Sequence, residues 1–501
     1  MLLLNLRRMI LWAVCSFALS SYAYTSYEKE TYVYGVIRGY ENYSDHQTIR
    51  LALRDFFGRK EGEEIVGIIA DDGSFSLSAP MAYTQELYLI YGTINSLLLN
   101  PGDSLYLEID ADILKDPKNK FPNGSYFIEF PDTELGKTNL AVSLFNAGKP
   151  VGPYAYDNAI EAEKSKSAEE YLEFISMREK DFREYLDVFL SDHQTTDLFK
   201  QWVEDHLKYE TLDELMRYRW THPYYNKQEI DDSHLPEGYF SFLENYNMND
   251  NKLFSIEHAD FLNELSFYVS QPPKEELDEV RTKNDWSVPF RLIEANTSGF
   301  TKELFFTKFY YFILEGQSIE AFEAVYDSLY SQNPFFLEVV EKKYTSTKNY
   351  LANKDVSSAN ISGLKSSLTD DLIQTIAETY KGKVIYVDFW APWCGPCLTE
   401  MPYSAELQKE MKGEDVVFLF FGVQCTEESW KATIANRKLT GEHKLLTNDQ
   451  YNILASKLGI NGIPHYTLID KNGNIVQKNA TRPSNKEKLT KEIKELLSSS
   501  N

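Results

Sequence analysis

The sequence has few cysteines, no metal-binding pattern and a shortage of positive charge. Only four cysteines occur in 501 residues, so the chain is not a small scaffold held together by disulfides. Its histidines form no HxxxH or HExxH pair and there is no second CxxC motif, so we predict no metal and no cofactor. The net charge of −25 disfavours binding to nucleic acid or to anionic lipid.

The negative charge is distributed unevenly. Residues 367–501 hold 16 Lys and Arg against 17 Asp and Glu, so nearly all of the excess belongs to the upstream two-thirds of the chain. A solvated acidic surface is the preferred interpretation, and attraction of basic partners is the alternative. The hydrophobic content of 43% is ample for folded cores, and the length favours about three domains.

The N-terminus resembles a signal peptide. Arg7 and Arg8 precede an apolar run at 9–19, which is too short to span a bilayer comfortably, and Ser-Tyr-Ala ends the segment as a small-x-small cleavage site. We therefore predict a signal peptide at residues 1–23 and a periplasmic or otherwise exported protein. A lipoprotein modified at Cys15 is disfavoured by the preceding valine, and an uncleaved membrane anchor is the remaining alternative.

The segment from Val384 to Pro402 carries the chemistry. A run rich in β-branched and aromatic residues ends at Cys394-Gly-Pro-Cys397, and a helix-compatible segment follows. At a helix start, unpaired N–H groups and the helix dipole would stabilise the Cys394 thiolate and lower its pKa from about 8.5. Cys397 would then displace the captured partner. A zinc half-site is the alternative, and no further ligands lie nearby.

This motif resembles the thioredoxin active site, which Trp393 to Cys397 match in full. Asp388, six residues earlier, is similar to the buried acid of that family, which takes the proton of the second cysteine. A buried carboxylate has a raised pKa and can exchange protons near neutrality. A solvated carboxylate at the strand end is the alternative for Asp388.

Gly462-Ile463-Pro464 resembles the cis-proline loop of thioredoxins. The resemblance implies that Ile463 and Pro464, together with Trp393, bind the substrate segment that carries the reacting sulfur. An ordinary trans turn is the alternative. His465 follows, where the family has a small residue, and its ring would lower the thiolate pKa if it were cationic and close to Cys394; a bystander role remains open.

Glu400, three residues after Cys397, resembles an acid of the TlpA/ResA branch of bacterial thiol–disulfide oxidoreductases. The resemblance implies a catalytic contribution from Glu400, and a solvated first-turn carboxylate is the alternative. Cys425 follows an apolar run at 416–423 and is interpreted as a small buried hydrophobe. A second redox thiol is the alternative, since an odd cysteine is left over.

The predicted fold is multidomain. Short strands separated by Asp-Gly and Pro-Gly turns predict an antiparallel β-sandwich at 24–130, which resembles the β-domain preceding thioredoxin modules in Bacteroidetes exported proteins. Aromatic residues at helical spacing predict a helical domain at 131–353 with a break at His222-Pro223. A Ser/Asn/Lys-rich linker at 354–367 leads to an α/β thioredoxin-like domain at 368–501.

These observations predict an exported thiol–disulfide oxidoreductase. The Gly-Pro pair between the cysteines resembles reducing thioredoxins, so we expect reduction of exported proteins with disulfides or thiols, apocytochrome c thiols included, and a membrane-borne electron donor. A partner-binding protein with an inherited thioredoxin module and a thiol peroxidase are the alternatives. The sequence identifies neither the client nor the oligomeric state.

Overall fold

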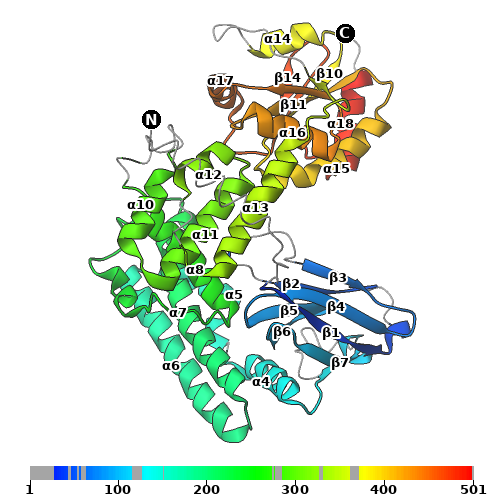
Figure 1. Ribbon diagram of the computed structural model, residues 1–501. Helices are drawn as coiled ribbons and strands as arrows, with labels where there is room; N and C mark the ends of the chain where they lie inside the picture. Colours follow the sequence, from blue (N-terminus) through cyan, green and yellow to red (C-terminus); the bar gives the residue numbers. More distant parts are fainter. Residues whose placement is uncertain are drawn as a thin grey trace, which may run out of the picture. The chain divides into compact units, whose positions relative to one another are not determined.

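The chain forms two compact units, Met1–Phe305 and Phe306–Asn501 (Figure 1). The computed structural model describes residues 27–42, 47–53, 56–57, 64–115, 127–150, 152–273, 276, 285–326, 331–361 and 372–498. The predicted signal peptide at 1–23 lies outside these residues.

The first unit begins with two four-stranded sheets, ordered β4-β1-β7-β8 and β3-β2-β5-β6. Their strands are β1 (Lys29–Arg38), β2 (Thr48–Leu53), β3 (Glu64–Ile68), β4 (Ser74–Met81), β5 (Gln85–Tyr91), β6 (Thr93–Leu99), β7 (Ser104–Asp110) and β8 (Ile128–Glu129). Side chains alternate between buried and exposed along β4, as a sheet with one solvated face requires. Inward residues of both sheets form one hydrophobic cluster that includes Val33, Leu77, Leu51 and Leu89.

The predicted antiparallel pairing fails at one place, because β1 and β7 run parallel. A parallel pair needs a long crossover connection. The chain between β1 and β7 supplies it, because β2, β3, β5 and β6 belong to the other sheet, while β4 returns to pair with β1. The turn signals in the sequence indicated the strands but not their order, so the parallel pair could not be foreseen.

Helices complete the first unit. They are α2 (Ala111–Lys115), α4 (Glu134–Gly148), α5 (Tyr156–Ser165), α6 (Ala168–Asp192), α7 (Asp197–Tyr225), α8 (Ile256–Ser270), α10 (Ser287–Asn296) and α11 (Gly299–Glu315), the last of which runs into the second unit. The break predicted at His222-Pro223 is wrong by a few residues, since α7 continues through Pro223 to Tyr225. Proline in the last turn removes only one hydrogen bond of a helix that is about to end.

The strands and helices of the first unit are joined by buried polar contacts. The Asn139 side chain of α4 accepts from the N–H of Leu98 at 2.7 Å and donates to its carbonyl at 3.1 Å. Trp202 of α7 donates its indole N–H to Glu86 of β5 at 2.9 Å. The boundary predicted at residue 130 therefore separates two parts of one compact unit.

The second unit is built on a six-stranded sheet ordered β14-β13-β10-β11-β12-β9. Its strands are β9 (Asn360–Ile361), β10 (Val384–Trp390), β11 (Val416–Gly422), β12 (Glu442–Leu445), β13 (His465–Ile469) and β14 (Ile475–Gln477). Its helices are α12 (Ile319–Val325), α13 (Pro334–Ala352), α14 (Leu372–Thr379), α15 (Gly395–Glu410), α16 (Glu427–Arg437), α17 (Asn448–Leu458) and α18 (Lys486–Ser498). Strand β9 falls within the segment predicted as a linker.

Strand β10 is central and fully buried, because helices cover both faces of the sheet (Figure 1). Tyr386 and Trp390 pack into the cluster formed with α15, α16 and α18, and the intervening Val387 and Phe389 pack toward α14 and α17. Because side chains alternate along a strand, Asp388 lies on the face of α15, α16 and α18. Strand β10 therefore places Asp388 on the same side of the sheet as α15, the helix that begins within the CxxC motif.

Candidate active site

Cys394 and Cys397 form a disulfide with a Cα–Cα distance of 5.3 Å. Cys394 is the N-cap of α15, and its Sγ accepts from the backbone N–H of Cys397 at 3.2 Å. The predicted helix start at the CxxC motif is therefore confirmed. In the reduced protein, the same N–H and the positive end of the helix dipole would stabilise a Cys394 thiolate.

Trp393 marks the exposed side of the disulfide. Its side chain is 45% exposed, and its indole N–H donates to the carbonyl of Gln424 at 2.9 Å. Gln424 lies in the loop after β11 with a φ of 50°. A flat, partly apolar surface is thus fixed next to Cys394, although the two cysteines are themselves buried. The role of Gln424 was missed because a backbone carbonyl leaves no signal in the sequence.

Asp388 is buried, with 2% of its surface exposed, so a solvated strand-end carboxylate is excluded. Its register partner on β13 is Tyr466. The Oδ1 atom has no hydrogen-bond partner among the described residues. Burial, and then the charge of Glu400, raise the pKa of Asp388 well above its usual range. The protonated form of Asp388 is therefore favoured more strongly than that of a solvated aspartate.

Glu400 is also buried, so it is not a solvated first-turn carboxylate. Its two oxygens accept from the backbone N–H and the hydroxyl of Ser484, each at 2.8 Å. These bonds fix the carboxylate to the segment before α18. Ser484 was missed in the sequence, because it lies 84 residues from Glu400 and belongs to no motif.

The Ile463–Pro464 peptide bond is cis, as predicted, and leads directly into β13. His465 is buried and pairs with Phe389 of β10. Burial lowers the pKa of His465, which opposes the idea that a cationic ring activates Cys394. The catalytic roles of Asp388 and Glu400 and the substrate-binding roles of Trp393, Ile463 and Pro464 stay predictions.

Cys425 is the free cysteine among the described residues, and it lies in the loop between β11 and α16. Its side chain packs against the cluster that contains Cys394 and Cys397. Burial raises the pKa of the Cys425 thiol to about 12. The side chain is half-buried, so Cys425 packs as a small, partly buried hydrophobe rather than a fully buried one. A thiol of this kind is poorly nucleophilic at neutral pH.

One cluster of metal-type ligands occurs in the described part of the chain, formed by Glu86, His206 and Glu257. His206 bonds Glu257 through Nδ1 at 2.8 Å, and its Nε2 lies 3.1 Å from the ammonium of Lys149. Lys149 also bonds Glu210. Both imidazole nitrogens are occupied and a cation is already present, so the cluster is a buried ion-pair network rather than a suitable cage for a metal.

Known proteins resemble the C-terminal part of this chain. The family model described as Redoxin matches residues 353–495. This region is a ResA/TlpA-like domain of the thioredoxin superfamily. The ResA thiol-disulfide oxidoreductase of Bacillus thuringiensis is 30% identical over 101 residues, which cover 20% of this chain and 55% of that protein. The thioredoxin-like protein YneN of Bacillus subtilis is 35% identical over 109 residues, covering 21% and 53%.

The chain thus spans about half the length of the curated relatives it matches. A solved structure of a Bacteroides vulgatus protein described as a thiol-disulfide oxidoreductase is 37% identical to the ResA/TlpA-like domain. The match covers 24% of this chain and 82% of that one, with a TM-score of 0.22. Among the described residues, no helix combines the length and the apolar character needed to cross a membrane.

Proposed function

We propose that this protein is an exported thiol–disulfide oxidoreductase that reduces protein disulfides through Cys394 and Cys397. The observation that carries the proposal is the Cys394–Cys397 disulfide at the first turn of α15, beside the exposed ring of Trp393. Export is supported by the signal-like sequence at residues 1–23.

The exchange proceeds in two steps. The Cys394 thiolate attacks one sulfur of a client disulfide, so a mixed disulfide forms and one client thiolate leaves. The ionised form of Asp388 takes the proton of Cys397, whose thiolate attacks the Cys394 sulfur and releases the second client sulfur as a thiolate, which the newly protonated Asp388 or water can protonate. The enzyme is left with the Cys394–Cys397 disulfide and the client gains two electrons. A membrane-borne dithiol donor would restore the reduced enzyme, and Ile463 and Pro464 would hold the client backbone during exchange.

Trapping tests this function. Cys397→Ser should accumulate a mixed disulfide between Cys394 and a client, because the second step is blocked. Cys394→Ser should trap nothing, and Cys425→Ser should behave as the native protein. Non-reducing electrophoresis and peptide mass spectrometry identify the bond. The function is refuted if Cys397→Ser yields no covalent partner in an exported-protein extract and the native protein does not reduce insulin.

The direction of transfer is tested separately. A reductase needs a low reduction potential, close to the thioredoxin value of about −270 mV. Equilibration with glutathione, followed by alkylation and mass spectrometry of the Cys394–Cys397 peptide, measures this potential. A value near about −120 mV, at the oxidant end of the range, would reverse the proposed direction.

A partner-binding role of the first unit is the second candidate. The edge strand β3 leaves Val66 and Ile68 exposed, at 56% and 82%, and unpaired edges can accept another chain. Val66→Lys and Ile68→Lys would then prevent client capture without changing insulin reduction. A thiol peroxidase would not show this difference between client capture and insulin reduction. The high pKa of the Cys425 thiol does not favour peroxidase activity.

A further inference from the structure

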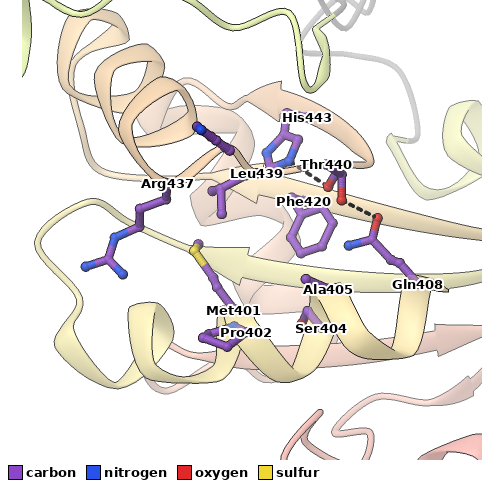
Figure 2. A pocket seen from close by; sticks show the side chains of 11 residues that line it. Met401, Pro402, Ser404, Ala405, Gln408, Phe420, Arg437, Leu439, Thr440 and His443 are labelled. Carbon is purple, nitrogen blue, oxygen red and sulfur yellow. Dashed lines mark hydrogen bonds between the residues drawn. The ribbon is translucent and has the colours of Figure 1, made fainter. Parts of the chain in front are cut away.

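The second unit contains a cavity of about 370 Å³ beside α15, at residues of this helix that come after the CxxC motif. Met401, Ser404 and Gln408 of α15 form one wall, and the segment 437–440 after α16 forms the other (Figure 2). Phe420 of β11 and His443 of β12 lie between them. The volume lies within the range of small-molecule pockets, and neither active-site cysteine lines the cavity.

Two buried polar atoms of the lining lack a partner among the described residues. Ser404 is 2% exposed with an unbonded Oγ, and His443 is fully buried with an unbonded Nδ1. The Nε2 of His443 lies 3.2 Å from the carbonyl oxygen of Thr440. Because a carbonyl only accepts, Nε2 carries the hydrogen and Nδ1 presents a lone pair. Unsatisfied buried groups of this kind are destabilising, so a ligand that bonds them is favoured.

The His443 ring is neutral at physiological pH, since burial lowers its pKa to about 4. It stacks on Phe420 with ring centroids 4.7 Å apart, which fixes the orientation of Nδ1. The Oε1 of Gln408 accepts from the hydroxyl of Thr440 at 3.2 Å, so the Gln408 amide hydrogens remain available as donors. The lining therefore offers one fixed acceptor together with the donors of Ser404 and Gln408.

The charge of the lining is positive, although residues 367–501 as a whole are close to neutral. Arg437 and Lys438 line the cavity and no Asp or Glu does. Arg437 is exposed and forms no ion pair with any residue that the structure describes. A guanidinium in this setting favours a carboxylate or a phosphate, which it can bond through two N–H groups.

We propose that this cavity binds a small organic anion that carries a hydroxyl or N–H group. The carboxylate or phosphate pairs with Arg437, the hydroxyl donates to Nδ1 of His443, and the apolar body packs between Met401 and Phe420. This ligand site goes beyond disulfide exchange and does not depend on it, because its groups are separate from Cys394, Cys397 and Asp388.

Isothermal titration calorimetry on the full chain tests the proposal, with 4-hydroxybenzoate as the probe. We expect saturable binding that is weaker for benzoate, which lacks the hydroxyl, and weaker still for 4-hydroxybenzamide, which lacks the charge. Comparing benzoate with phenyl phosphate then decides which anionic group the site prefers. Arg437→Gln should weaken 4-hydroxybenzoate about tenfold, and Ser404→Ala should weaken it less.

Lys409→Gln is the matched control, since Lys409 is an exposed cation of α15 outside the cavity, and binding should be unchanged. Cys394→Ser should bind the probe as the native protein does while losing disulfide exchange, which separates this proposal from the redox function. The proposal is overturned if none of the anionic probes gives saturable heat, or if Arg437→Gln binds 4-hydroxybenzoate as tightly as the native protein.

Discussion

Asp388→Asn should stabilise the protein at neutral and alkaline pH. The Asp388 carboxyl is buried on the central strand, one of its oxygens has no hydrogen-bond partner in the described structure, and Glu400 adds repulsion. All three features disfavour the ionised form, so burial and Glu400 raise the pKa of Asp388 well above its usual range. Asparagine has nearly the same shape and cannot ionise.

The sign and size of the effect follow from proton linkage. An unfolded Asp loses its proton near pH 4, whereas folded Asp388 retains it to a higher pH. As pH rises above 4, the unfolded state binds fewer protons than the folded state, so the stability of the native protein falls. Each pH unit between the two pKa values removes about 1.4 kcal/mol. The stability difference between Asp388→Asn and the native protein should grow at that rate and level off above the pKa of folded Asp388.

Calorimetric unfolding between pH 4.5 and 9 measures this difference, and the transition that the substitution moves identifies the unit containing β10. Asp415→Asn is the control, because its side chain is 72% exposed and should give no gain that depends on pH. A stability difference that is the same at every pH, or that turns unfavourable above neutrality, would refute the assignment of a raised pKa to Asp388. If Asp388 is the proton acceptor of Cys397, as proposed, the same substitution should also slow disulfide exchange.

Three further outcomes are expected. Glu400→Gln removes a charge that raises the pKa of Asp388, so the pH–rate profile of insulin reduction should shift to lower pH; an unshifted profile would contradict this coupling. Cys425, with a pKa of about 12, should react with iodoacetamide on the order of 1,000-fold more slowly than an ordinary thiol, as peptide mass spectrometry of native and denatured protein can measure. Burial raises the pKa of Glu86 to about 7, so Glu86→Gln should increase the stability of the first unit above pH 7 by roughly 3 kcal/mol, and an increase equally large at pH 4.5 would argue against that cause.

The sequence was informative where a local pattern has one physical solution. A CxxC motif after an apolar run indicates a strand-to-helix junction, and the structure has β10 followed directly by α15. The resemblance to thioredoxins indicated a buried acid at Asp388 and a cis bond at Ile463–Pro464, with a solvated carboxylate and a trans turn as the alternatives, and the structure has the buried acid and the cis bond. In each case the residues that determine the geometry are neighbours in the chain.

Contacts between distant segments could not be read from these patterns. Ser484 bonds Glu400 across 84 residues, and β9 joins β12 from a segment whose composition indicated a linker. Helix α13 contacts α16, where Asn436 donates to the carbonyl of Tyr350. These partners are selected by tertiary packing, for which a single sequence carries no periodic signal.

Ser484 gives the carboxyl group of Glu400 a different environment from that of Asp388. Glu400 accepts two hydrogen bonds from Ser484, whereas the Oδ1 of Asp388 accepts none in the described structure. Burial, and then the charge of Glu400, raise the pKa of Asp388 well above its usual range. The protonated form of Asp388 is thereby favoured on the strand that leads into the CxxC turn. If Asp388 exchanges a proton with Cys397 as proposed, Glu400 would act through Asp388 as a tuning residue, and loss of the Ser484 hydroxyl should weaken that effect by releasing the Glu400 carboxylate.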